Sequence, residues 1–244
     1  MELIRINKFL TEAGYCSRRE ADRLIAANRV TVENKVPELG TKIPRTALVK
    51  VDGERIKLQS KDQFVYIAFN KPVGIVCTTD TQKERYNIID FIGHRERIFP
   101  IGRLDKPSEG LIFLTSDGDI VNKILRADNN HQKEYIVTVN RPIDDRFIQR
   151  MSNGIPILGT KTKKCKVERL SKNKFRIILT QGLNRQIRRM CEYLGYDVVQ
   201  LKRIRIMNVK LDIPTGHWRD LTPKEMQEIN QLVANSSKVN QKSK

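Results

Sequence analysis

A short polar stretch divides this sequence and limits what each part can fold into. Residues 58–63 read Leu-Gln-Ser-Lys-Asp-Gln, a composition that predicts a linker. The part before it is too short to build a large core, whereas the part after it can bury a sizeable one. We therefore expect domains at residues 1–60 and 64–234, followed by a basic disordered tail at 235–244.

The N-terminal part has the pattern of two helices and a few strands. The first helix is predicted by apolar residues at i, i+3, i+4 and i+7 spacing: Ile6, Phe9, Leu10 and Ala13. The second begins at Ser17, which is placed to cap it, with Glu20 placed to bond back as in a capping box. Residues 30–32 and 48–51 predict strands, and Asp52-Gly53 predicts a hairpin turn.

The larger part mixes strands and helices without a regular βαβ alternation. Strands are predicted at 65–69, 111–115, 135–139, 175–179 and 198–209. Helices are predicted at 119–126, 144–151, 184–194 and 223–233. The pattern favours an α+β fold, with a small N-terminal α/β domain and a catalytic domain built on a central mixed or antiparallel sheet flanked by helices.

The charge balance restricts the kind of partner. The chain has 46 Lys and Arg against 28 Asp and Glu, a formal charge of +18, which favours a polyanion such as nucleic acid. A merely soluble basic protein is the alternative. No apolar run of about 18 residues occurs, and the first ten residues are too polar for a signal peptide. The four cysteines are scattered and there are three histidines, so we expect free thiols in the cytoplasm and no metal site.

One charged loop has the residue types that catalysis uses. Asp105 lies between Arg103 and Lys106 in a segment rich in Gly and Pro, directly before the apolar run 111–114. A rigid strand that holds a charged loop is a common place for catalytic groups, and an ionised carboxylate can act as a nucleophile. A turn aspartate that bonds to its own backbone is the alternative interpretation.

Four segments, taken in order, resemble the motifs of one family. The segment from Gly102-Arg103-Leu104-Asp105 to Asp117-Gly118 resembles the signature of pseudouridine synthases of the RsuA type. Asn70-Lys71-Pro72-x-Gly74, Lys133-Glu134-Tyr135-x-Val137 and Asn184–Met190 resemble its other motifs. Residues 1–60 resemble an S4 RNA-binding domain, and residues 156–160 and 205–209 are most similar to the RluF branch.

The resemblance implies isomerisation of a uridine to pseudouridine in structured RNA, without a cofactor or metal. By branch the substrate is large-subunit (23S) ribosomal RNA, with tRNA as a second candidate. The family uses one aspartate, which corresponds to Asp105; whether it attacks the sugar, attacks the base or removes a sugar proton stays open. Tyr135 would stack on the flipped base, although an ordinary cross-strand aromatic has the same pattern. Arg103 would help displace the base.

The helix predicted at 184–194 supplies a partner for Asp105. Its apolar stripe contains Ile187, Met190, Cys191 and Leu194. Arg188 lies at the edge of this stripe, so its guanidinium can reach inward and pair with the carboxylate. A surface salt bridge with Glu192 at i+4 is the alternative.

The remaining basic residues are candidates for RNA contacts by a monomeric protein. The predicted contacts are Arg5, Lys8, Arg18, Arg19, Arg23, Lys71, Arg185, Arg189, Lys202, Arg203 and Arg205. Basic runs at 161–176 and 198–210 fit RNA backbone contact or a solvated face, and in 198–210 alternation predicts a charged face opposite an apolar one. The rival functions are an RNA-binding assembly factor with an idle pocket and a DNA-binding protein.

Overall fold

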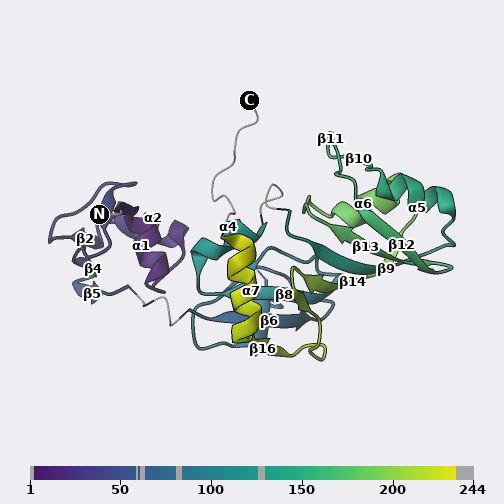
Figure 1. Cartoon of the computed structure of the whole chain (residues 1–244). Helices are drawn as coiled ribbons and strands as arrows, with labels where there is room; N and C mark the ends of the chain where they lie inside the picture. Colours follow the sequence, from purple (N-terminus) through teal and green to yellow (C-terminus); the bar gives the residue numbers. More distant parts are fainter. Residues whose placement is uncertain (1–2, 59, 61–63, 81–83, 126–129, 235–244) are drawn as a thin grey trace. The chain divides into compact units, whose positions relative to one another are not determined.

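A computed structural model describes residues 3–58, 60, 64–80, 84–125 and 130–234 (Figure 1). The chain divides into two compact units. The first comprises Met1–Val65 with Arg95–Arg97 and Ser116–Gly118, and the second comprises the remainder. The predicted linker lies largely, and the predicted tail entirely, outside the described residues. The domain limits at residues 60 and 64 therefore stay predictions.

The N-terminal unit packs two short helices against small antiparallel sheets. The helices are α1 (Ile6–Glu12) and α2 (Arg18–Ala26); the strands are β1 (Leu3–Arg5), β2 (Val30–Val32), β3 (Lys42–Pro44), β4 (Val49–Val51) and β5 (Glu54–Ile56). Phe9 and Leu10 are in the centre of its core. Ser17 caps α2 as predicted, because its Oγ accepts from the Glu20 amide at 3.2 Å. The Glu20 carboxylate does not make the predicted return bond; it contacts Arg23 at 3.1 Å instead.

The second unit is built on one mixed sheet (Figure 1). Its strands are β6 (Tyr66–Lys71), β7 (Phe99–Ile101), β8 (Glu109–Thr115), β9 (Lys133–Val139), β12 (Lys166–Ser171), β13 (Lys174–Leu179), β14 (Val198–Ile206), β15 (Val209–Lys210) and β16 (Trp218–Asp220). The order is β12-β13-β9-β14-β8-β6-β16, with β15 on β14 and β7 on β8. Among the described strand pairs only β8 and β14 are parallel, so this pair joins two antiparallel halves.

Helices cover the two halves of the sheet separately. They are α3 (Ile88–Ile92), α4 (Gly118–Leu125), α5 (Asp145–Ser152), α6 (Gln186–Tyr193) and α7 (Pro223–Val233), and a small hairpin contains β10 (Pro156–Ile157) and β11 (Thr160–Lys161). α4 and α7 share a core with β6, β8 and β14. On the other half, Phe147 of α5 lies edge-on to Phe175 of β13 at 5.2 Å. The α+β class predicted from the sequence is confirmed.

The parallel junction depends on a glycine. Gly110 of β8 has φ +107°, and a Cβ there would lie 2.3 Å from the carbonyl oxygen of Arg203 on β14. The clash would be between a Cβ and a backbone atom, so neither could move aside. Gly110 thus lets β14 approach β8 directly beside the loop that carries Asp105.

Some predicted elements change in the structure. The strand predicted at 198–209 is wrong at its end, because Met207 has φ +53° and turns the chain back into β15. The alternation predicted for this segment is also wrong, since the register shifts between Arg203 and Arg205. The helix predicted at 223–233 has those bounds as α7. Within the described ranges no helix is long and apolar enough to cross a membrane.

Candidate active site

A cavity of about 500 Å³ lies over the junction of the two sheet halves. It is lined by the loop 101–108, by β9 and β14, and by the segment 181–188 that leads into α6. Its volume is in the range of about 300–1,000 Å³ that small-molecule sites occupy. The sheet therefore brings three of the motif segments, which are far apart in sequence, to one site.

The loop that carries Asp105 is fastened on both sides of the carboxylate. The Leu104 amide donates to the Cys77 sulfur at 3.4 Å, and the Gly74 amide donates to the Lys106 carbonyl at 2.8 Å. The Ser108 amide donates to the Asp105 carbonyl at 2.9 Å, which closes a turn. All three bonds use backbone groups of the loop, so the position of the Asp105 side chain is set independently of its own charge.

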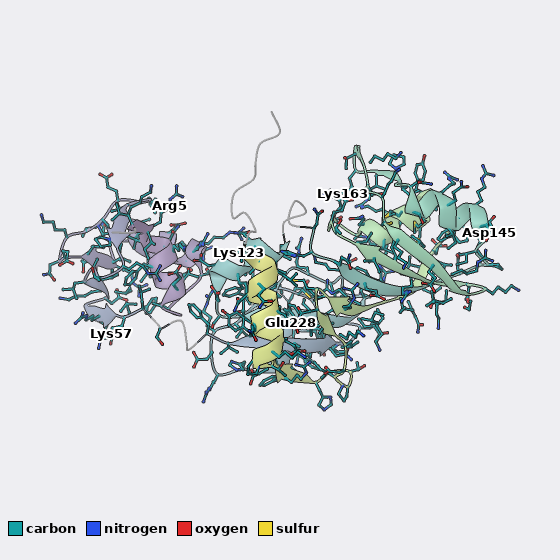
Figure 2. All side chains as sticks on the ribbon, viewed as in Figure 1. Arg5, Lys57, Lys123, Asp145, Lys163 and Glu228 are labelled. Atoms are coloured by element: carbon teal, nitrogen blue, oxygen red, sulfur yellow. The ribbon has the colours of Figure 1, made fainter. Side chains whose placement is uncertain are left out.

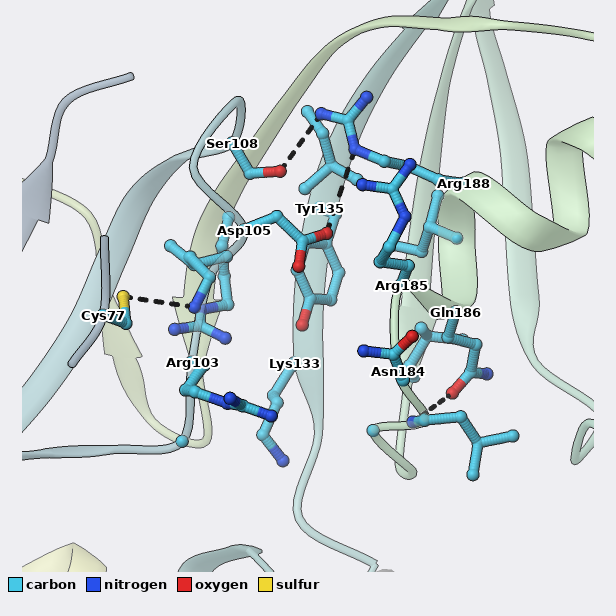
Figure 3. A pocket seen from close by; sticks show the side chains of 18 of the residues that line it. Cys77, Arg103, Asp105, Ser108, Lys133, Tyr135, Asn184, Arg185, Gln186 and Arg188 are labelled. Atoms are coloured by element: carbon cyan, nitrogen blue, oxygen red, sulfur yellow. Dashed lines mark hydrogen bonds and ion pairs between the residues drawn. The ribbon is translucent and has the colours of Figure 1, made fainter. Parts of the chain in front are cut away.

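Arg188 crosses the parallel junction and faces Asp105 (Figure 3). One terminal nitrogen donates to the Val198 carbonyl at 3.1 Å; the other donates to the Pro107 carbonyl at 3.0 Å and the Ser108 hydroxyl at 3.1 Å. Its Nε lies 3.9 Å from Asp105 Oδ2, which confirms the predicted ion pair at a long distance. Arg188 is buried and Glu192 pairs with Arg185 instead, so the surface salt bridge considered from the sequence is wrong.

The floor of the cavity is made by two neighbouring strands. Tyr135 of β9 is 9% exposed, and the Arg203 guanidinium of β14 lies 5.9 Å from the centre of its ring. Lys133 is two residues before Tyr135, so its side chain leaves the same face of β9 and enters the cavity. Burial is the main reason that the pKa of Lys133 is lowered to about 8, and the nearby positive charge of Arg203 is the second.

Two residues predicted to contact RNA are inside the protein. Lys71 is fully buried, and its Nζ donates to the Pro72 and Ile75 carbonyls at 2.8 Å each. Burial lowers the pKa of Lys71. Arg203 is 3% exposed, and its Nε donates to the Leu111 carbonyl. Surface contact with RNA is therefore wrong for both, because neither charge reaches solvent.

The other predicted residues divide by exposure. Arg103 and Arg185 line the cavity and are exposed, and Arg185, the residue directly before α6, has the uncommon φ of +49°. Also exposed are Arg5, Arg18, Arg19 and Arg23 (Arg5 is labelled in Figure 2). Half-buried are Lys8, Arg189, Lys202 and Arg205. Of these, Arg205 pairs with Glu134 at 2.7 Å and Lys8 with Glu12 at 3.2 Å. Their RNA contacts stay predictions.

Three residues that shape the site were not selected from the sequence. Lys133 enters the cavity, Cys77 holds the Asp105 loop, and Ser108 binds Arg188. The period of two along β9 could have indicated Lys133, since Tyr135 was already expected to face the base. No local signal marks Cys77, because its contact joins residues 27 positions apart.

Comparison with known proteins identifies the family to which the chain belongs. Residues 65–193 match the family described as RNA pseudouridylate synthase, and residues 4–43 match the S4 domain. The chain is 57% identical over 234 residues to the "Dual-specificity RNA pseudouridine synthase RluF" of Salmonella typhi, covering 96% of this chain and 81% of that protein. It is 33% identical to the "Ribosomal large subunit pseudouridine synthase B" of Bacillus subtilis, covering 93% and 96%.

A solved structure agrees over almost the whole length. A crystal structure of a pseudouridylate synthase, 27% identical, superposes with a TM-score of 0.68 and covers 93% of this chain and 99% of the other. Sequence and fold thus lead to the same assignment. The chain belongs to the RNA pseudouridine synthase family, is of the RluF type and carries an S4 domain in its N-terminal part.

Proposed function

We propose that the protein isomerises one uridine in large-subunit (23S) ribosomal RNA and one in tRNA, using Asp105 as its essential carboxylate. The observation that carries the proposal is the meeting of Asp105, Tyr135 and Arg188 in one cavity. The dual specificity is supported by the printed name of the relatives at 56–57% identity. The ribosomal substrate is supported by the name of the Bacillus subtilis relative.

The target uridine must leave its stack to reach this cavity. The Asp105 side chain is 34% exposed, so a flipped nucleotide has access to the carboxylate from the open side. The Tyr135 ring offers an aromatic surface for the pyrimidine. Arg103, exposed at the rim, is suited to hold the flipped nucleotide or to occupy the space that it left.

The reaction is an internal exchange of bonds and needs no co-reactant. The bond from C1′ to N1 breaks, the base turns, and C1′ joins C5; C5 loses a proton and N1 gains one. The Arg188 guanidinium places a positive charge opposite the Asp105 carboxylate, which can attack the sugar, attack the base or remove a sugar proton. Because Arg188 is tied to three backbone or hydroxyl oxygens, its charge is present before substrate arrives.

The RNA is held by exposed cations of both units. Arg18, Arg19 and Arg23 lie on the polar side of α2, where they can contact phosphates. We place the protein in the cytoplasm as a monomer, a proposal that rests on four free cysteines and the overall charge of +18.

The test is pseudouridine mapping of ribosomal RNA and tRNA from cells whose own copy of the gene has been deleted. These cells are complemented with either the wild-type gene or the Asp105→Asn variant. We expect one position in each RNA class to be modified by the wild type and unmodified with the variant. Modification of only one class would refute dual specificity, and modification of neither would refute the assignment of substrates. The same assay on naked RNA and on assembled subunits identifies the form that is modified.

A further inference from the structure

Lys133 is a buried lysine that the roles assigned above do not use. It is the first residue of β9, is 8% exposed and lines the cavity. Figure 3 shows its side chain beyond the hydroxyl end of Tyr135, on the side of the cavity where Arg103 lies. Within the described part of the chain its ammonium group makes no hydrogen bond or ion pair to another side chain, and it ends at the cavity and not in the packed core. A lysine whose stem is buried and whose charge meets an open cavity without a protein partner is available to a ligand.

The groups around Lys133 are mainly cationic. Arg203 faces it from β14, Arg103 and Asp105 from the loop, and Arg185 from the start of α6. The other titratable groups nearby are Tyr135 on its own strand, Cys77, Lys106, Arg188 and the buried His131. The Nη2 atom of Arg203 is buried, and among the described residues it has no hydrogen-bond partner. The floor thus holds two cations with unused donors and no carboxylate of its own.

The reaction brings negative charge to this floor. When the bond from C1′ to N1 breaks, both electrons stay with the uracil, and the charge spreads over N1 and the two carbonyl oxygens. If Asp105 instead adds to the base, the same carbonyl oxygens carry the charge. A fixed cation in a water-poor site stabilises such charge far better than water does.

We propose that the Lys133 ammonium, supported by Arg203, binds a carbonyl oxygen of the flipped uracil and stabilises its negative charge while the base turns. Residues two apart on a strand are about 7 Å apart, so Lys133 and Tyr135 can contact different parts of one base. The proton count of the reaction does not change, because Lys133 stays protonated throughout. This inference rests on the proposed use of the cavity by the uridine.

The test compares Lys133→Met, which removes the charge, with Lys133→Arg, which keeps it. Lys224→Met is the matched control, because Lys224 is exposed on α7 and does not line the cavity. We expect the single-turnover rate of Lys133→Met to fall by about 10²–10³-fold, with RNA affinity within about threefold of the wild type. Lys133→Arg should recover most of the loss, and the control should match the wild type.

The pH profile separates a role in charge stabilisation from a structural one. Lys133 is protonated below its pKa of about 8, so the wild-type rate should fall as the pH rises through that value. Lys133→Met should lack this fall, and Lys133→Arg should keep its rate to higher pH. If Lys133→Met does not fold by circular dichroism, the Lys133→Arg and wild-type profiles decide.

Two results would overturn the inference. One is a folded Lys133→Met protein with a rate within about threefold of the wild type. The other is an alkaline fall that is unchanged in a folded Lys133→Met or in Lys133→Arg. Failure of the proposed function itself would look different, since the wild-type protein would then modify neither RNA, or Asp105→Asn would retain activity, whatever happens at Lys133.

Discussion

The catalytic cavity and the N-terminal unit both depend on cations but place them in opposite environments. In and behind the cavity, Lys71, Lys133, Arg188 and Arg203 are each 8% exposed or less. In the N-terminal unit, Arg18, Arg19 and Arg23 are exposed on one helix. The first group acts over short distances with little screening, whereas the charges of the second are screened by salt.

The difference in burial predicts a difference in what mutation changes. A buried cation that is bonded to carbonyl oxygens holds backbone and substrate in one geometry, so its loss should reduce the rate of the chemical step. An exposed cation attracts RNA phosphates, so its loss should reduce affinity and salt dependence. The following predictions test whether this separation holds.

The largest effect is expected for Asp105→Asn. The loop is held by backbone groups, and the amide is nearly the same size, so the fold should survive. The amide is neither a nucleophile nor a base, so the single-turnover rate should fall by about 10⁴-fold or more. RNA affinity should change by less than about threefold, because it rests on phosphate contacts elsewhere.

Asp145→Asn is the matched control, since Asp145 is exposed on α5 and outside the cavity. Pseudouridine formation, RNA binding and circular dichroism are measured on each protein. A folded Asp105→Asn variant that works at a tenth of the wild-type rate would contradict the catalytic role of Asp105. A folded variant that loses RNA binding would instead break the separation between chemistry and binding.

Arg188→Met should have the next largest effect. It removes the charge that faces Asp105 and leaves the Pro107 and Val198 carbonyls without their donor. We expect a fall of about 10²–10³-fold at neutral pH.

Ser108→Ala provides the comparison, because it removes one bond to Arg188 and keeps the ion pair. Its rate should fall by less than about tenfold. Both rates are measured under single-turnover conditions, with circular dichroism as the folding control. A folded Arg188→Met variant that works as fast as Ser108→Ala would exclude Arg188 as the charge partner.

On the N-terminal side, the matching change is the combined replacement of Arg18, Arg19 and Arg23 by Gln. Affinity for RNA should fall, and the dependence of log K on log salt should become shallower by about 0.7–0.9 for each phosphate that is no longer neutralised. The rate at saturating RNA should stay the same. Binding titrations at several salt concentrations measure the affinity and the salt dependence.

A second triple variant shows whether position matters or only charge. Lys35, Lys42 and Lys57 are exposed in the same unit but lie off α2, and Gln at all three removes the same charge. If both triple variants weaken binding equally, the α2 face is not a specific contact. A slower rate at saturating RNA in the α2 variant would show that this face also affects the chemical step.

The two regions also differ in how much of their structure could be predicted from the sequence. The N-terminal unit rests on local signals: the cap at Ser17 and the Asp52-Gly53 turn appear as predicted. Ile6, Phe9 and Leu10 of α1 are buried as predicted, whereas Ala13 is half-buried and lies just after the helix. The motif around Asp105 and the inward reach of Arg188 are also readable, because a short segment and a helical wheel contain them. Local pattern is sufficient where neighbours in sequence are neighbours in space.

The structure of the cavity floor could not be predicted from local sequence patterns. Lys71 and Arg203 look like surface cations in the sequence, yet both are buried by strand pairing. Arg203 lies opposite Gly110, a residue 93 positions away, and this register depends on the parallel pairing of β8 and β14. Alternation along one strand cannot reveal which side a neighbouring strand will cover, so burial of these charges requires the tertiary structure.

The smallest effect is expected at Glu225, whose charge is neither fully buried nor fully exposed. Its carboxylate accepts two bonds of 2.8 Å from Arg219 and one from the Thr222 amide, which completes a capping box at the start of α7. Glu225→Gln weakens both contacts and should reduce the free energy of unfolding by about 1–2 kcal/mol at pH 7. Glu228→Gln on the same helix should cost less than about 0.5 kcal/mol, because an amide oxygen can still accept from Asn208.

The pH dependence identifies the source of this stabilisation. The hydrogen bond from Arg219 is the main cause that lowers the pKa of Glu225 from its ordinary value of 4.5. A lowered pKa in the folded state stabilises the protein above the ordinary value, and this contribution disappears as the pH falls through the lowered pKa. The difference between wild type and Glu225→Gln in urea unfolding should therefore shrink below about pH 4.5. A stability difference that is as large at pH 3 as at pH 7 would mean that the helix cap, and not the charge of Glu225, supplies the stability. The half-buried ion pair would then contribute no more to the free energy of unfolding than an exposed charge does.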